Sequence, residues 1–232
     1  MRFDVPTLVV AAHADDESLG CGGTIAKIVA SGGSVTVLFL ADGESSRFIG
    51  NEETELLEVR IKRRKEMASS ALSHLGVNKS TFLDLKDNRL DTVPLLELTK
   101  MIENAIDHYA PEMIITHHPY DLNIDHKMAA IATITATRPF QDQIVRQLIA
   151  FETPSSSEWN VQSQVNVFAP NFFVDISEVW GKKVSALKAY SEEMRDFPHP
   201  RSIESIEALA RWRGSNCGRE YAEAFTLLRS VQ

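Results

Sequence analysis

Short apolar runs alternate with helical patterns through the first two thirds of the chain, and this alternation constrains the fold more than any other feature. The runs are rich in Val, Ile, Leu and Phe, and they predict strands at residues 7–12, 35–40, 81–83, 113–116 and 145–151. The patterns between them predict helices at residues 18–31, 53–75, 93–109 and 125–137. Strands that alternate with helices form a mostly parallel sheet with helices on both faces. We therefore expect an α/β fold of this kind.

The C-terminal third follows a weaker pattern. It predicts helices at residues 176–190 and 203–212 and a last strand at residues 224–228. No linker-like stretch separates this part from the rest of the chain. We therefore expect a cap region on the same domain, and a single domain that spans residues 1–232.

Charge and composition exclude several classes of protein. The 232 residues include 24 Lys and Arg against 32 Asp and Glu, a net charge of −8, so the chain lacks the basic character of nucleic-acid binders. No apolar run approaches the roughly 18 residues of a membrane span, and acidic residues follow the N-terminal run too soon for a signal peptide. Two cysteines, Cys21 and Cys217, do not make a disulfide framework. We expect a cytoplasmic protein with no nucleic-acid partner and no membrane span.

A histidine and three acids follow the first predicted strand, in the order His13-Ala14-Asp15-Asp16-Glu17. Such acids suit a helix N-terminus, where a carboxylate accepts hydrogen bonds from free N–H groups. The alternative is a metal site, because imidazole and carboxylate together suit zinc or iron more than calcium. A further carboxylate beside the ligands would be placed to take a proton from metal-bound water. A divalent cation would also explain why three adjacent acids are tolerated.

The glycines at positions 20, 22 and 23 do not match a dinucleotide-binding loop. That fingerprint needs Gly or Ala at position 25, which is Ile25 here, and the preceding acids would repel a pyrophosphate. Close packing of the helix against the sheet is the better explanation for these glycines.

A second group of ligand-type residues follows the fourth predicted strand, between His117 and His126. If the strand order is 3-2-1-4, the first and fourth strands are neighbours, and their ends flank the crevice where open α/β sheets bind ligands. His13, Asp16 and one histidine of this segment would then converge on one cation, with a fourth position open to water as in catalytic zinc sites. We favour His126 over His117 and His118, because it lies at the start of a helix that faces the crevice.

These two motifs resemble those of the PIG-L/LmbE-like family of zinc-dependent N-acetylglucosaminyl deacetylases, and the resemblance runs along nearly the whole chain. The first family motif, Ala-His-Pro-Asp-Asp-Glu, corresponds to residues 12–17, and the second motif ends in Asp125-His126. The resemblance implies a Rossmann-like α/β fold and one zinc ion per chain. The implied roles are metal binding by His13, Asp16 and His126, and general base for Asp15.

The chain departs from the family pattern at two positions. Ala14 replaces the proline of the first motif, which removes no functional group. Asn123 stands where many members have a histidine, and an amide can donate a hydrogen bond but cannot shuttle a proton. This form looks like the branch that includes diacetylchitobiose deacetylases, in which a C-terminal histidine supplies the missing group. The resemblance makes His199 that acid and oxyanion stabiliser, with a solvated loop histidine as the alternative.

The same branch carries an arginine and an aspartate that match Arg64 and Asp87, and the resemblance makes both of them substrate-binding candidates together with Asn123. Arg64 lies in a run of charged residues at 62–66, so a solvated helix face is the alternative for it. Asp125 is expected to orient a ligand histidine or the catalytic histidine from behind.

The resemblance, together with these residues, implies metal-assisted hydrolysis of an N-acetylated amino sugar, with acetate as one product. One alternative is a zinc amidase that acts on a non-sugar N-acyl compound, and another is a non-catalytic module that binds a sugar or a metal. The expected partner is a small-molecule N-acetyl sugar or its conjugate. The trimers and hexamers that are frequent in the family imply a homo-oligomer.

Overall fold

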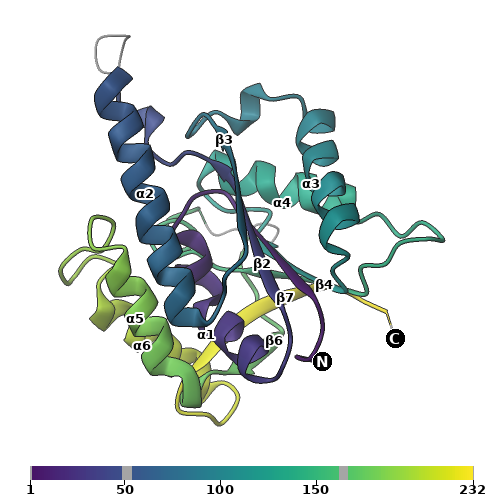
Figure 1. Ribbon diagram of the computed structural model, residues 1–232. Coiled ribbons are helices and arrows are strands. Elements are labelled where there is room, and N and C mark those ends of the chain that lie inside the picture. The colour runs from purple at the N-terminus through teal and green to yellow at the C-terminus, as the bar shows by residue number, and fades with distance from the viewer. Residues whose placement is uncertain (1, 49–53, 162–166, 232) are drawn as a thin grey trace.

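The apolar runs form the parallel part of a seven-stranded sheet in the computed structural model, which describes residues 2–48, 54–161 and 167–231 (Figure 1). The strand order is β3-β2-β1-β4-β5-β7-β6. Strands β1 to β5 run parallel, whereas β7 is antiparallel to both β5 and β6. The order 3-2-1-4 that the site prediction required is therefore confirmed. The strands are β1 (Thr7–Ala11), β2 (Val35–Ala41), β3 (Ser80–Leu85), β4 (Met113–His117), β5 (Gln147–Phe151), β6 (Phe172–Asp175) and β7 (Ala222–Ser230).

Helices cover both faces of this sheet, as predicted. Helices α1, α2, α5 and α6 lie on one face, and α3 and α4 lie on the other (Figure 1). Every residue of β1 and β2 is buried, as expected for parallel strands that are covered on both sides. Their side chains alternate, so that Val9 and Phe39 join one apolar core while Leu8 and Leu38 join the other. The helices are α1 (Asp16–Ala30), α2 (Thr54–Leu75), α3 (Leu95–Tyr109), α4 (Ile124–Ala136), α5 (Trp180–Ala189) and α6 (Ile203–Ser215).

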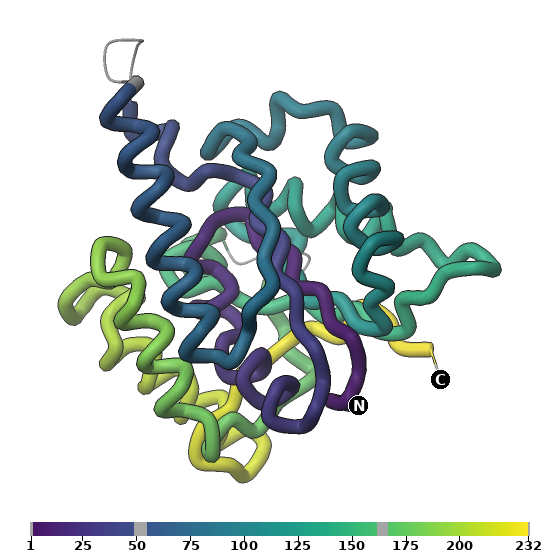
Figure 2. Tube along the Cα trace, in the orientation of Figure 1, coloured from purple at the N-terminus to yellow at the C-terminus, as the bar shows by residue number. Residues whose placement is uncertain are grey.

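The C-terminal third adds two strands to the sheet as well as two helices to one face. Strand β7 is longer than the predicted last strand. It pairs with β5, so the C-terminal end of the chain lies beside residues 147–151 (Figure 2). Strand β6 was missed by the sequence analysis, because it has only four residues and lies at the edge of the sheet. Helix α5 begins at Trp180, after a short 3-10 turn at Ser177–Val179. The predicted start of α2 at residue 53 lies outside the described residues.

Helix α1 is kinked at Cys21, whose backbone dihedrals (φ −144°, ψ 19°) are not helical. Beyond the kink, Glu223 of β7 accepts hydrogen bonds from the backbone N–H groups of Gly23 and Thr24. Lys183 of α5 forms a buried ion pair with Glu223, with 2.6 Å between Nζ and Oε1. A Cβ atom on Gly23 would lie 2.8 Å from a neighbouring side chain. Close packing therefore explains this glycine, as predicted.

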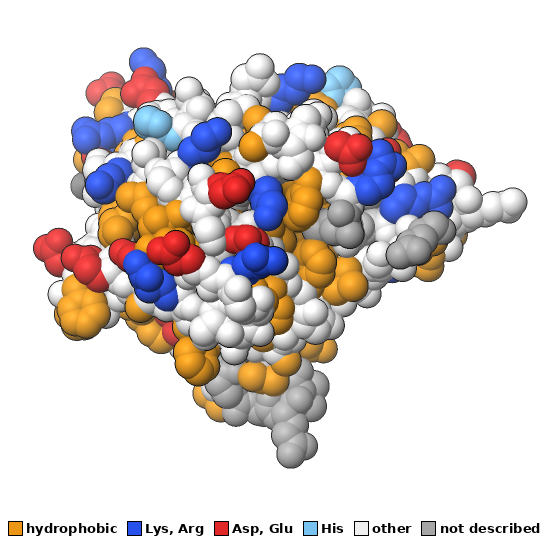
Figure 3. Space-filling view, turned by 90° about the horizontal axis from the view of Figure 1, so that it is seen from below, with side chains coloured by type: hydrophobic (Ala, Val, Ile, Leu, Met, Phe, Trp, Pro, Cys, Tyr) orange, Lys and Arg blue, Asp and Glu red, His pale blue; other side chains and the backbone are white. Residues whose placement is uncertain are grey.

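Two observations describe the helices and one face of the surface. No helix in the described ranges is long and apolar enough to cross a bilayer. Figure 3 shows acidic and basic side chains intermixed on one face of the molecule, so the described part of that face offers no continuous basic surface for nucleic acid.

Candidate metal centre

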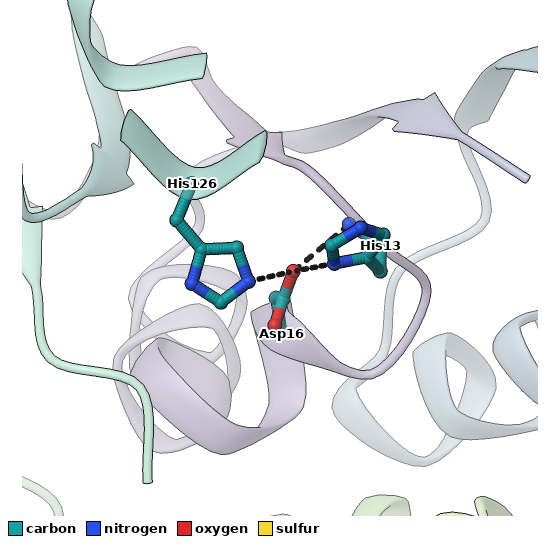
Figure 4. A group of neighbouring side chains, drawn as sticks. All are labelled: His13, Asp16 and His126. Carbon is teal, nitrogen blue, oxygen red and sulfur yellow. Dashed lines mark hydrogen bonds and ion pairs between the residues drawn. The ribbon is translucent and has the colours of Figure 1, made fainter. Parts of the chain in front are cut away.

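Three ligand-type side chains meet at the carboxyl ends of β1 and β4, which are neighbours in the sheet (Figure 4). His13 lies in the loop after β1, Asp16 is the first residue of α1, and His126 lies in the first turn of α4. Asp16 Oδ2 lies 3.3 Å from His13 Nδ1 and 3.4 Å from His126 Nε2. This is the switch point of the sheet, because the chain leaves β1 toward β2 on one side and β4 lies on the other.

Two of the distances within this group match those between the ligands of a tetrahedral cation. Zinc ligands about 2.0–2.1 Å from the metal are separated from one another by about 3.3–3.4 Å in a tetrahedron. Asp16 Oδ1 is buried and has no hydrogen-bond partner among the described residues, and His13 and His126 are also buried. Two imidazoles and one carboxylate form a donor set that suits zinc. The group can therefore hold a metal ion and leave a position for water.

Two carboxylates hold His13 from behind. The Nε2 atom of His13 lies 3.0 Å from Asp125 Oδ2 and 3.0 Å from Asp87 Oδ1. Asp125 also accepts hydrogen bonds from the backbone N–H groups of Asn88 and Leu90, so its own orientation is fixed. The imidazole therefore donates from Nε2 and leaves the Nδ1 lone pair for a metal. Asp125 thus contacts His13 and not His126, the histidine that follows it in the sequence.

A different carboxylate supports His126. The Nδ1 atom of His126 lies 3.1 Å from Asp121 Oδ1, and the hydroxyl groups of Ser156 and Ser157 donate to the same carboxylate. Burial raises the pKa of Asp121, but these hydrogen bonds outweigh burial and hold the pKa well below its usual range. The sequence analysis missed Asp121, although its position five residues before a predicted ligand was a usable signal.

His117, the alternative ligand, has its hydrogen-bonding atoms occupied. Its Nε2 accepts the backbone N–H of Ala12 at 2.9 Å, and its Nδ1 lies 3.3 Å from Thr153 Oγ1. Burial lowers the pKa of His117 to about 3, so the ring is neutral. It stacks on His126, with ring centroids 4.1 Å apart, and its Nε2 also lies 3.4 Å from Asp16 Oδ2.

Asp15 lies beside the ligand group but is not a member of it. Its backbone has φ 141°, which is a strained conformation for a residue other than glycine. Its side chain is buried, and Oδ2 accepts a hydrogen bond from Arg201 Nη1 at 2.8 Å. Its N–H donates to Glu17 Oε2, and the other carboxylate oxygen of Glu17 accepts from Tyr190. Asp15 is therefore a fixed carboxylate next to the candidate ligands.

A polar pocket of about 130 Å³ opens next to this carboxylate. Its lining includes the predicted substrate residues Arg64, Asp87 and Asn123, together with His13 and Asp15. A larger cavity of about 580 Å³ lies at the other end of the parallel strands and contains none of the candidate ligands. The smaller pocket is therefore the one that adjoins the candidate metal ligands.

Arg64 lies in the pocket wall and not on a solvated helix face, so the structure excludes that alternative. Its Nη1 atom lies 2.6 Å from Glu193 Oε1, and Nη2 donates to the carbonyl of Gly43. Burial lowers the pKa of Arg64, but Asp15 and the neighbouring glutamates outweigh burial and raise the pKa. Glu193 also pairs with Arg47 at 3.0 Å, so one carboxylate joins several guanidinium groups. The sequence analysis missed Glu193 and Arg47.

Of the two remaining predicted site residues, Asn123 lies in the pocket wall and His199 lies outside it. Asn123 lines the pocket and caps α4, since its side-chain oxygen accepts the N–H of Asp125 at 2.8 Å. His199 does not line this pocket, but its Nδ1 accepts the backbone N–H of Arg201 at 3.0 Å. The edge of its ring meets Trp159, with centroids 5.7 Å apart. Arg201 therefore links His199 to the base candidate Asp15, a role that the sequence analysis did not assign.

Comparison with known proteins identifies the family of the chain. The family model described as PIG-L, GlcNAc-PI de-N-acetylase, matches residues 8–137. The diacetylchitobiose deacetylase of Thermococcus kodakarensis is 28% identical over 229 residues, which cover 97% of this chain and 83% of that protein. A crystal structure of a conserved protein from Thermus thermophilus has a TM-score of 0.77 and 26% identity, and the match covers 98% of this chain and 96% of that one.

Not every relative is named for the same reaction. The 4-oxalmesaconate hydratase of Pseudomonas putida is 27% identical over 197 residues, which cover 78% of this chain and 71% of that enzyme. The reaction must therefore be argued from the site, whereas the family follows from the match itself, which spans more than half of the chain. The chain belongs to the PIG-L family of de-N-acetylases.

Proposed function

We propose that this protein is a zinc-dependent hydrolase that removes the N-acetyl group from an amino sugar or a conjugate of one. The observation that carries the proposal is the position of Asp15. It is a buried carboxylate that adjoins a two-histidine, one-aspartate group without belonging to it, and it lines a polar pocket. A base beside a metal-binding group is the arrangement that metal-assisted hydrolysis needs.

The reaction joins a water oxygen to the acetyl carbon and breaks the carbon–nitrogen bond. The water loses one proton and the departing nitrogen gains one, so the products are a free amine and acetic acid, which then releases its proton to become acetate. Bound zinc would polarise the acetyl carbonyl and lower the pKa of water toward about 7. Asp15 accepts the proton from the attacking water as general base. His199 donates a hydrogen bond to the developing oxyanion.

The proton that reaches the departing nitrogen comes from Asp15, once it is protonated, or from His199. Two features support His199 for this part of the chemistry. Its Nδ1 is already an acceptor, so its other ring nitrogen is the donor, and Arg201 connects it to Asp15. Asn123 lacks a proton that it can transfer, although its amide remains available as a donor in the pocket.

The lining of the pocket supports a sugar as the substrate. Arg64, Asp87 and Asn123 present charged and amide groups that hydrogen-bond hydroxyls, and the small volume leaves little room for a long acyl chain. Several of the deacetylases among the relatives are named for sugar compounds, such as diacetylchitobiose and N-acetylglucosaminyl malate. Trp159 lies half exposed beside His199 and offers an aromatic face to a sugar ring.

Acetate release from a panel of compounds tests the proposal. The zinc-loaded protein should release acetate from N-acetylglucosamine, N,N'-diacetylchitobiose or N-acetylglucosaminyl malate, and it should not hydrate 4-oxalmesaconate. Cleavage of a non-sugar N-acetyl amide alone would favour the amidase alternative. No turnover of any amide by protein that holds its metal would contradict the proposal and favour a binding module.

A further inference from the structure

One arginine contacts both groups that are proposed to move protons. Arg201 lies between His199 and Ser202, the residue that caps α6 by accepting the N–H of Ser205 at 3.0 Å. This cap fixes the backbone of the segment at the start of the helix. The side chain of Arg201 is only 21% exposed, and it extends from there toward the end of β1.

Two nitrogen atoms of the Arg201 guanidinium group donate hydrogen bonds to two different residues. Its Nη1 donates to Asp15 Oδ2 at 2.8 Å, and its Nε donates to Ser155 Oγ at 2.7 Å. Both partners have positive φ, 141° for Asp15 and 70° for Ser155. Strained residues of this kind persist where the surroundings fix them, and they are concentrated at functional sites. One planar group thus ties two strained loops together.

The backbone of the same residue acts on the histidine. The N–H of Arg201 donates to His199 Nδ1 at 3.0 Å, so this nitrogen carries no proton in the neutral ring. The ring proton of His199 is therefore on Nε2, which is the tautomer that can donate a hydrogen bond away from the chain.

We propose that Arg201 is a positioning residue that fixes both proton-transferring groups, Asp15 through its guanidinium and His199 through its backbone N–H. The inference rests on the proposed function. A lysine could not replace it fully, because a single ammonium cannot reach the carboxylate of Asp15 and the hydroxyl of Ser155 in a fixed plane.

A kinetic cycle separates this role from a structural one. Arg201→Met should keep one zinc per chain and a KM within about threefold of wild type, while kcat falls about a hundredfold. Arg201→Lys should recover part of that loss. In the Asp15→Asn background the same Arg201→Met change should cause no further loss, because residues that act as a unit are not additive. Equal losses in both backgrounds, or loss of zinc, would overturn the proposal.

Arg213→Met is the matched control. Arg213 lies in α6, the helix that follows Arg201, and forms a two-pronged ion pair, with Glu152 at 2.7 Å from both donor atoms, but it does not line the pocket. Its kcat and KM should stay at the wild-type values. A hundredfold fall in kcat for this variant as well would show that breaking any arginine ion pair in this part of the chain has the same effect, which would overturn the proposal.

A readout that needs no turnover tests the histidine directly. Long-range proton–nitrogen NMR of the protein should show His199 with an unprotonated Nδ1 and a protonated Nε2. A proton on Nδ1 would contradict the proposed backbone contact. If the wild type cleaves no N-acetyl sugar, the proposed function fails, and this measurement still decides the placement of Arg201.

Discussion

The pocket has two sides that are built in opposite ways. The metal side consists of the candidate ligands His13, Asp16 and His126 with the carboxylates behind them, Asp87, Asp121 and Asp125. The arginine side consists of Arg47, Arg64 and Arg201, which pair with the carboxylates of Glu44, Glu193 and Asp15 at 2.6 to 3.6 Å. Carboxylates outnumber cations on the metal side, whereas the arginine side already pairs its charges internally. We therefore expect a bound cation to balance the charge of the metal side, whereas the arginine side requires none.

The largest expected effect comes from Asp15, where the two sides meet. Asp15→Asn should keep its zinc and lower kcat by about 10²- to 10⁴-fold, because an amide cannot accept the proton of water. Steady-state acetate release, together with elemental analysis of the same samples, measures both quantities. A variant that retained most of its activity would show that Asp15 is not the base.

The second prediction tests whether the metal side is incomplete without a cation. Burial lowers the pKa of His126, but Asp16 and Asp121 outweigh burial and raise the pKa to about 9 in the metal-free protein. A folded-state pKa above the unfolded value near 6.5 gives stability that is complete below pH 6.5 and is lost as the pH rises through 9. The metal-free protein should therefore lose up to about 3 kcal/mol of unfolding free energy across this range.

The stabilisation that zinc adds should show the opposite trend, because the ligands must be unprotonated to bind it. The increase in unfolding free energy on adding zinc should therefore grow from pH 6.5 to pH 9. Denaturant titrations at several pH values, with and without zinc, measure both trends. His126→Gln should flatten the metal-free curve, whereas His108→Gln, at an exposed position on α3, should leave it unchanged. Parallel curves with and without zinc would contradict the charge imbalance on the metal side.

The third prediction concerns the carboxylates behind the ligands. Asp121→Asn should weaken zinc binding about 10- to 100-fold, because it removes the acceptor that orients His126. Competition with a chromogenic chelator measures the affinity. Asp142→Asn, at an exposed loop position, is the control and should bind zinc like the wild type. Unchanged affinity in Asp121→Asn would mean that the ring of His126 is held by packing alone.

The smallest expected effect belongs to the arginine side. Arg64→Lys keeps the charge but loses the planar contacts to Glu193 and Gly43, so KM should rise about tenfold or less with zinc unchanged. Arg63→Lys is the matched control, because the neighbouring Arg63 is 61% exposed and pairs only at the surface with Glu192. A loss of zinc in Arg64→Lys would show that the two sides are not independent.

The same contrast explains what the sequence could predict. The metal side follows from local information, because short motifs sit directly at the ends of β1 and β4 and the strand order brings them together. Their role as ligands stays a prediction, although His13, Asp16 and His126 do lie within reach of one cation. The sheet and its helices were predicted for the same reason, because the apolar residues within each short run are enough to indicate that the run is buried.

Features that depend on distant partners were not predicted. Glu193 and Arg201 acquire their positions through ion pairs that join the segment before α6 to α2 and to the end of β1. Nothing in the local pattern distinguishes them from solvated charges. The backbone N–H groups of α1 just beyond its kink likewise donate to Glu223, about 200 residues away along the chain. Charge complementarity across the fold is visible only in three dimensions.

The central claim is that His13, Asp16 and His126 hold one metal ion, and metal content tests it most directly. Elemental analysis of the purified wild type beside His126→Ala should find about one zinc per wild-type chain and none in the variant. Circular dichroism of both proteins checks that the variant is folded. A folded wild type that holds no metal even after zinc is supplied would contradict the account.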